Sequence, residues 1–169
     1  MTPDLHIVLV APEIPWNTGN VGRTCLAVGA TLHLVRPLGF QLDQRHLRRA
    51  GLDYWQHVDV TTWTGWDAFE DALPSLGSPW FFTAEADRTI HDIERSDAAE
   101  PRVLVFGSES TGFPPPLRAR FRDHWPDRLV AIPMIAGPVR SLNLSTAVAV
   151  AAYEIRRQLG FPISTPHST

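Results

Sequence analysis

The chain has 169 residues, of which 44% are hydrophobic and 20% are charged, and its formal net charge is −3 at pH 7. This length suits one domain with a substantial core, and the composition excludes an intrinsically disordered chain. The negative charge argues against indiscriminate nucleic-acid binding, although it allows a local basic face.

The cysteine content and the absence of targeting signals predict a cytoplasmic protein. Cys25 is the single cysteine, so it cannot form an internal disulfide, and its small apolar neighbours predict a core thiol. Residues 1–10 lack an export signal, and no apolar run approaches the ~18 residues that span a bilayer. The seven histidines are scattered without metal-ligand spacing, so we expect no metal and no membrane contact.

Apolar runs alternate with helix-like segments along the chain. The first half is predicted to contain a strand at 5–11, a helix at 19–28, a strand at 31–35, a helix at 44–50, a short strand near 58–61 and a helix at 66–73. The second half is predicted to contain strands at 80–83 and 103–106, a helix at 115–121, a strand at 129–132 and a helix at 144–159. Gly29, Gly51 and Pro74 are the predicted helix stops. Residues 1–160 form a single domain on this interpretation, and 161–169 form a frayed polar tail.

Continuous apolar strands that alternate with helices predict an α/β fold, with a mostly parallel sheet and helices on both faces. Ligands bind such sheets in the loops beyond the carboxyl ends of the strands. This rule selects three loops, which follow Ala11, Phe106 and Ile132 and are rich in Gly, Pro, Asn, Ser or Glu. We therefore expect the three loops to form one site.

The first loop, residues 11–23, leads into a predicted helix. Asn17 or Thr18 is the predicted N-cap, which places Arg23 about one turn into the helix. The helix dipole favours an anion at that end. Arg23 is therefore either a solvated surface residue or a contact for a phosphate or a polarised hydroxyl.

The second loop, residues 106–114, contains Gly107 and Gly112 on either side of four residues. The lysine of a phosphate-binding loop is absent, because Phe113 follows the second glycine, and this argues against a nucleotide triphosphatase. Glu109 either caps the helix that follows it or takes part in the site.

The third loop, residues 132–143, leads into a helix that is nearly all Ala and Val in its first turns and is therefore expected to be buried. Its free N-terminal N–H groups are either capped by Ser and Asn side chains or available to a small polar ligand.

Three patterns in this order carry a resemblance to a known family. They are Asn17-x-Gly19-x-x-x-Arg23, then Phe106-Gly107-x-Glu109-x-x-Gly112, then Ile132-Pro-Met134 followed by Ser141-Leu-Asn143-Leu-Ser145. Together they resemble the SPOUT RNA methyltransferases. The segment Leu47-Arg-Arg-Ala-Gly-Leu-Asp53-Tyr54 is similar to the small, extension-free branch that 2′-O-methylates the wobble nucleotide, cytidine or uridine, of certain tRNAs.

The resemblance implies a C-terminal deep trefoil knot, S-adenosylmethionine as the methyl donor bound in the knot, tRNA as the substrate and a homodimer as the working unit. The residues that the family pattern assigns to donor binding are Thr83, Gly107, Ile132, Met134, Ser141 and Leu142. The residues assigned to the reaction centre are Arg23, Glu109, Asn143 and Ser145. Arg23 would engage the target ribose or its phosphate, and Tyr153 would belong to the dimer interface.

RNA contacts are expected at Asn17, Arg23, Arg48 and Arg49; for Arg48 and Arg49 the alternative is an exposed basic helix face. Trp16 or Trp55 would stack on a base of the anticodon loop, and core packing is the alternative for Trp55. Other functions compatible with the sequence are 2′-O-methylation of another tRNA or rRNA ribose, non-catalytic RNA binding on the same fold, and mononucleotide binding by an unknotted α/β domain.

Overall fold

A six-stranded parallel sheet forms the centre of the protein, in the order β3-β2-β1-β5-β4-β6. The computed structural model describes residues 4–41, 53–93 and 100–161. The strands are β1 (Leu5–Val10), β2 (Thr31–Val35), β3 (Val60–Trp63), β4 (Ser78–Phe82), β5 (Arg102–Phe106) and β6 (Leu129–Val130). The predicted parallel α/β fold is thus confirmed.

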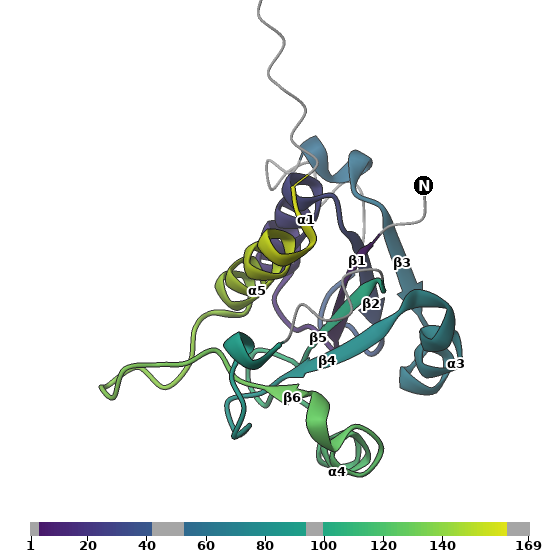
Figure 1. Cartoon of the computed structure of the whole chain (residues 1–169). Helices are drawn as coiled ribbons and strands as arrows, with labels where there is room; N and C mark the ends of the chain where they lie inside the picture. The colour runs from purple at the N-terminus through teal and green to yellow at the C-terminus, as the bar shows by residue number, and fades with distance from the viewer. Residues whose placement is uncertain (1–3, 42–52, 94–99, 162–169) are drawn as a thin grey trace, which may run out of the picture.

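Helices cover both faces of the sheet, which explains why the strands are apolar at successive positions. Helices α1 (Pro15–Val28) and α5 (Leu144–Leu159) lie side by side on one face, and α3 (Trp66–Leu76) and α4 (Pro115–His124) lie on the other (Figure 1). Neighbouring strand residues point to opposite faces, so Ile7 packs in the α1–α5 layer and Val8 in the α3–α4 layer. Both side chains are fully buried.

Three short 3-10 helices complete the described structure: η1 (Asp53–His57), η2 (Ile90–Asp92) and η4 (Pro126–Arg128). Segment η1 packs on α1, because the Tyr54 hydroxyl donates to the Gly19 carbonyl at 2.9 Å. A Cβ atom at Gly22 would lie 2.6 Å from the Trp55 ring, so the glycine makes room for that indole. Of the two alternatives for Trp55, the structure therefore supports core packing.

The predicted start of the first helix is wrong. Helix α1 begins at Pro15 with Ile14 as its N-cap, and Asn17 and Thr18 are buried inside the helix. Proline is favoured at the first helical position because its missing N–H has no partner there and its φ suits the helix. Arg23 consequently lies about two turns into α1.

The observed ends of other elements differ from the predicted ends by a few residues. Pro74 does not stop α3, which continues to Leu76: the proline only lacks the N–H that would complete one hydrogen bond of the last turn, and Leu73 beside it is buried in the core. Strand β3 begins at Val60 instead of 58, and β6 ends at Val130 instead of 132. The predicted helix at 44–50 and its stop at Gly51 lie outside the described residues.

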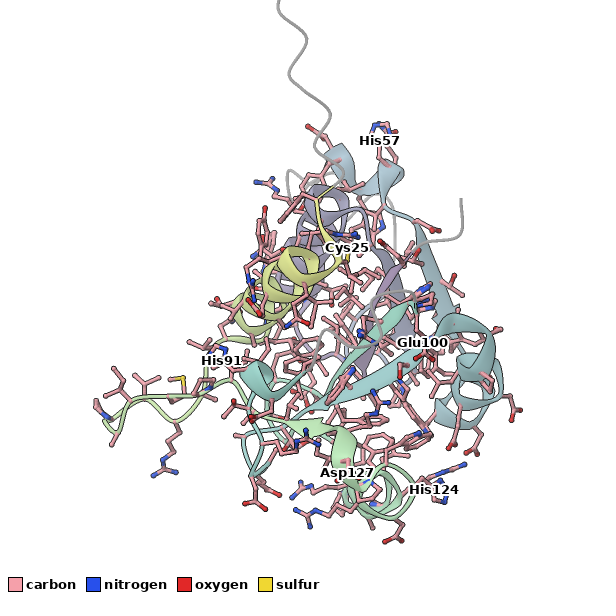
Figure 2. All side chains as sticks on the ribbon, in the orientation of Figure 1. Cys25, His57, His91, Glu100, His124 and Asp127 are labelled. Carbon is pink, nitrogen blue, oxygen red and sulfur yellow. The ribbon has the colours of Figure 1, made fainter. Side chains whose placement is uncertain are left out.

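Cys25 is fully buried, as predicted, in the α1 layer (Figure 2), and burial raises the pKa of its thiol to about 12. Such a thiol is inert at neutral pH. None of the helices in the described part of the chain has the length and apolar character needed to cross a bilayer.

Candidate active site

A cavity of about 640 Å³ lies at the carboxyl ends of β4, β5 and β6. The six residues predicted to bind the methyl donor all line it: Thr83, Gly107, Ile132, Met134, Ser141 and Leu142. They come from the loops that follow β4, β5 and β6, which the sheet brings together at one edge. The first loop, residues 11–23, contributes no residue to the lining of this cavity. Cavities of this size bind small organic ligands. The role of each residue remains a prediction.

The second loop is held in a closed turn beside this cavity. Ser108 and Gly112 exchange two backbone hydrogen bonds of 3.0 Å each. A Cβ atom at Gly107 would lie 2.2 Å from the carbonyl carbon of Gly112, and Gly112 itself has a φ of +66°. Both positions therefore require glycine, the first for close approach and the second for a left-handed backbone.

Glu109 caps the N-terminus of α1, and not the helix that follows it. Its carboxylate accepts hydrogen bonds from the backbone N–H groups of Glu13 at 2.7 Å and Ile14 at 3.1 Å. In return, the Glu13 carboxylate accepts from the Ser110 backbone N–H at 3.0 Å and from the Ser110 hydroxyl at 2.7 Å. We call these four residues the carboxylate clasp. It joins the first loop to the second, with negative charge at the positive end of α1.

A chain of side-chain hydrogen bonds extends the clasp to the third loop. The Asn17 amide donates to Glu109 at 3.1 Å, and the Asn143 amide donates to the Asn17 side-chain oxygen at 3.0 Å. The Asn143 oxygen accepts from the backbone N–H of Ser145 at 2.9 Å and from its hydroxyl at 2.7 Å. Asn143 is thus the N-cap of α5, which confirms capping in the third loop. Glu109, Asn17, Asn143 and Ser145 form one network across all three motifs.

Arg23 does not line the cavity. It lies on the exposed side of α1, with its guanidinium 4.6 Å from the centre of the Tyr54 ring, a cation–π geometry. Tyr153 is 50% exposed on α5. Arg48 and Arg49 lie outside the described residues.

The sequence reasoning missed a charged cluster at the cavity rim. Glu85 accepts hydrogen bonds from Arg118 at 2.9 Å and Arg122 at 3.1 Å, and Glu85 and Arg118 line the cavity. In the sequence, only the four-residue spacing of the two arginines on α4 could have indicated this cluster. That spacing does not identify a site, because it is common on the solvated faces of helices. Within the described ranges, no three His, Cys, Asp or Glu side chains lie together in a way that could hold a metal ion.

The fold and the cavity define a class. A parallel sheet with a ligand cavity beyond its strand ends, bordered by glycine turns, is an α/β ligand-binding domain of the kind that includes methyltransferases. The chain belongs to the SpoU rRNA Methylase family, whose model matches residues 4–153.

Relatives with assigned names agree with this family. A tRNA (cytidine(34)-2′-O)-methyltransferase of Burkholderia pseudomallei is 46% identical over 158 residues, which cover 92% of this chain and 96% of the relative. The protein of the same name from Acidovorax sp. is 44% identical, with 92% and 93% covered. A solved structure concerned with 2-OH methylation of C/U34 on tRNA has a TM-score of 0.78 and 49% identity, with 92% of this chain and 90% of that chain covered.

A more distant structure shares the fold. It is an AdoMet-bound rRNA methyltransferase from Sinorhizobium meliloti, with a TM-score of 0.77 and 24% identity, and the match covers 95% of this chain and 58% of that chain.

Proposed function

We propose that this protein transfers a methyl group from S-adenosylmethionine to the ribose 2′-hydroxyl of the wobble nucleotide, cytidine or uridine, of specific tRNAs. The observation that carries this proposal is the convergence of the predicted donor residues on one cavity beside the Glu109–Asn17–Asn143 network. The named relatives at 44% and 46% identity support the substrate. As a tRNA-modifying enzyme it would act in the cytoplasm.

The cavity fits the donor in size and in chemistry. Its volume of about 640 Å³ suits a nucleoside with an amino-acid arm, and its floor holds the stacked rings of Phe82 and Phe106, 4.6 Å apart. Backbone groups at Gly107, Ile132 and Ser141 would hold the donor, and Met134 and Leu142 would line its adenine pocket. When bound, S-adenosylmethionine supplies an electrophilic methyl group on a sulfonium.

The protein's own part in the reaction is alignment and charge stabilisation. The 2′-oxygen forms a bond to the methyl carbon as the carbon–sulfur bond breaks, and the hydroxyl proton leaves to an RNA phosphate or to water. No histidine lines the cavity within the described residues, so positioning supplies most of the rate. Arg23 would stabilise the developing oxyanion, and Asn143 and Ser145 would brace the third loop behind the donor.

We further propose a trefoil knot, formed as the segment before α5 threads past the second loop. Strand β6 lies at the edge of the sheet, whereas α5 packs on α1 over the middle of it, so the segment between them must return across the strand ends (Figure 1). On its way it lines the same cavity as the second loop. Gly107 and Gly112 provide the tight turn that such a crossing needs.

A homodimer would complete the site. Val150 and Tyr153 on α5 are 42% and 50% exposed, which is a suitable apolar face for a second copy.

Since Arg23 lies outside the cavity of its own chain, we propose that it serves the cavity of the other protomer. Mixing Arg23→Ala protein with Leu142→Arg protein, whose donor pocket is blocked without a backbone clash, after unfolding and refolding should then restore about a quarter of wild-type activity, because half of the dimers are mixed and each carries one intact site. Inactive mixtures would place Arg23 in its own chain's reaction.

The proposed function is tested by nucleoside mass spectrometry of tRNA from a strain that lacks this protein. We expect 2′-O-methylation at the wobble position to disappear and to return with the wild-type chain. Normal wobble methylation with a loss elsewhere would assign the enzyme to another RNA ribose. Calorimetry with S-adenosylmethionine addresses the non-catalytic alternative, because a scaffold protein would bind RNA but not the donor.

A further inference from the structure

Trp16 stands apart from the other tryptophans of this chain. All six lie within the described residues, and five of them are buried or half-buried, whereas 59% of Trp16 is exposed. Core packing therefore does not account for this indole. Single exposed apolar residues are common on proteins, so the significance of Trp16 depends on its surroundings.

The backbone of Trp16 is fixed beside the cavity. It lies in the first turn of α1, between Ile14, whose N–H donates to Glu109, and Asn17, whose side chain donates to the same carboxylate. Glu109 lines the cavity, and Asn17 is 6% exposed. The exposed indole is thus carried on a rigid helix end at the edge of the site, and not on a loose loop.

Trp16 shares one face of α1 with two exposed polar residues. Asn20 and Arg23 follow it at the i+4 and i+7 positions, which align along a helix, and both are exposed. The Arg23 guanidinium is stacked on Tyr54, 4.6 Å from the ring centre. Seven residues of helix span about 10 Å, which is about three nucleotides of a stacked strand. An exposed aromatic ring for a base and a fixed cation for a phosphate are two of the components from which single-strand nucleic-acid sites are built.

We propose that Trp16 is a stacking platform for an unpaired base of the anticodon loop, adjacent to the nucleotide whose ribose is methylated. This inference rests on the proposed function, and it adds a substrate-binding residue to it. Sequence-specific recognition of RNA uses unpaired loop bases that stack on aromatic side chains. Trp55, the other candidate, is packed against Gly22 in the core. The occupant is RNA because Trp16 shares its face of α1 with Asn20 and Arg23, and Arg23 is the residue proposed to engage the target ribose.

The test compares two apolar replacements that differ in having a ring, Trp16→Phe and Trp16→Leu. The probe is a fluorescently labelled RNA hairpin with the sequence of the anticodon arm and cytidine at the wobble position. We expect Trp16→Leu to raise the hairpin Kd about tenfold or more and Trp16→Phe to raise it only a few-fold. The affinity for S-adenosylmethionine should not change in either variant. Indole fluorescence should be quenched when unlabelled hairpin binds the wild type, and this quench should be absent in Trp16→Phe.

Leu26→Ala is the control for loss of exposed apolar surface on α1, because Leu26 is 39% exposed and lies about 15 Å along the helix from Trp16. It should bind the hairpin like the wild type. Equal losses for Trp16→Phe and Trp16→Leu would overturn the stacking role. So would a shift of Trp16→Leu to monomer in sedimentation velocity, since Trp16 would then be a contact between protomers. Failure of the proposed function is seen separately, as absence of wobble methylation by the wild-type protein.

Discussion

Glu109 accepts a hydrogen bond from the backbone N–H of Glu13 at 2.7 Å, across 96 residues of sequence. A helix usually obtains its N-cap from the residue before it, but Ile14 has no side chain that can accept a hydrogen bond. The second loop instead supplies an acceptor for the Ile14 N–H, so the helix start and the cavity wall share one carboxylate.

Glu109→Gln should therefore destabilise the protein and weaken donor binding together. The amide keeps one acceptor but loses the charge, and its NH₂ group faces a backbone N–H, so the free energy of unfolding should fall by about 1–3 kcal/mol. Urea unfolding measures the stability, and calorimetry measures the Kd for S-adenosylmethionine. Glu100→Gln, a change at an exposed carboxylate (Figure 2), is the control. Equal unfolding midpoints for the two variants would refute the capping role.

Asn143→Asp should separate the two roles of Asn143. Aspartate caps a helix as well as asparagine does, so the bond from the Ser145 N–H is kept. It cannot donate to the Asn17 oxygen, and two oxygens would face each other where the 3.0 Å bond now lies. We expect a stability loss of about 1 kcal/mol or less, with a much larger loss of methyl transfer. Asn143→Ala, which removes cap and link together, should lose more stability; if Asn143→Asp keeps full activity, the link between the first and third loops is not needed for catalysis.

The sheet could be predicted from the sequence because its evidence is local. The central strands are buried on both faces, so they read as unbroken apolar runs, and β2 and α5 were predicted at their observed bounds. The edge strand β3 was misplaced by two residues at both ends and β6 by two residues at one end, because burial on their outer side is incomplete and the pattern is weaker.

The site was predictable only as far as its residues follow a family pattern. That pattern selected seven residues that line the cavity, which are Thr83, Gly107, Glu109, Ile132, Met134, Ser141 and Leu142, but not Glu85 or Arg118 at its rim. It did not select Glu13, whose contact with Ser110 spans 97 residues and leaves no trace in either local segment. It also did not show that Arg23 lies outside the cavity, because the predicted helix began at residue 19, whereas α1 begins at Pro15 and carries Arg23 about two turns beyond its start.

Replacing Asp4 should destabilise the protein more than replacing Arg156, although the two residues form one ion pair. Arg156 donates two 2.8 Å hydrogen bonds to the Asp4 carboxylate and is 2% exposed, whereas the Asp4 side chain is 53% exposed. Asp4→Asn leaves a buried guanidinium without its counter-charge and should lower the free energy of unfolding by about 1–3 kcal/mol. Arg156→Met keeps the buried volume and leaves an aspartate that water can solvate, so it should cost less. Urea unfolding of both variants checks this order, and the reverse order would show that the packing of Arg156 outweighs its charge.

A buried histidine pair should make the protein sensitive to mild acid. His33 is 3% exposed, and its Nδ1 accepts from the Trp63 indole at 3.1 Å, so its Nε2 carries the proton and donates to His6 Nδ1 at 3.0 Å. A second proton on His33 would meet the indole N–H directly. Burial, together with the nearby His6, lowers the pKa of His33 from 6.5 to about 4.

The sign of the pH effect follows from that lowered pKa. Below pH 6.5 His33 binds a proton in the unfolded chain, whereas in the folded chain it stays neutral down to about pH 4. The contribution of neutral His33 to the free energy of unfolding is therefore fully present above pH 6.5 and decreases as the pH falls toward 4. The loss attributable to this residue is roughly 3 kcal/mol at the acid end. Urea midpoints between pH 7 and pH 4.5 should converge for the wild type and His33→Gln, because only the wild type carries this penalty. If the His33→Gln difference stayed constant with pH, His33 would titrate alike in the folded and unfolded chains.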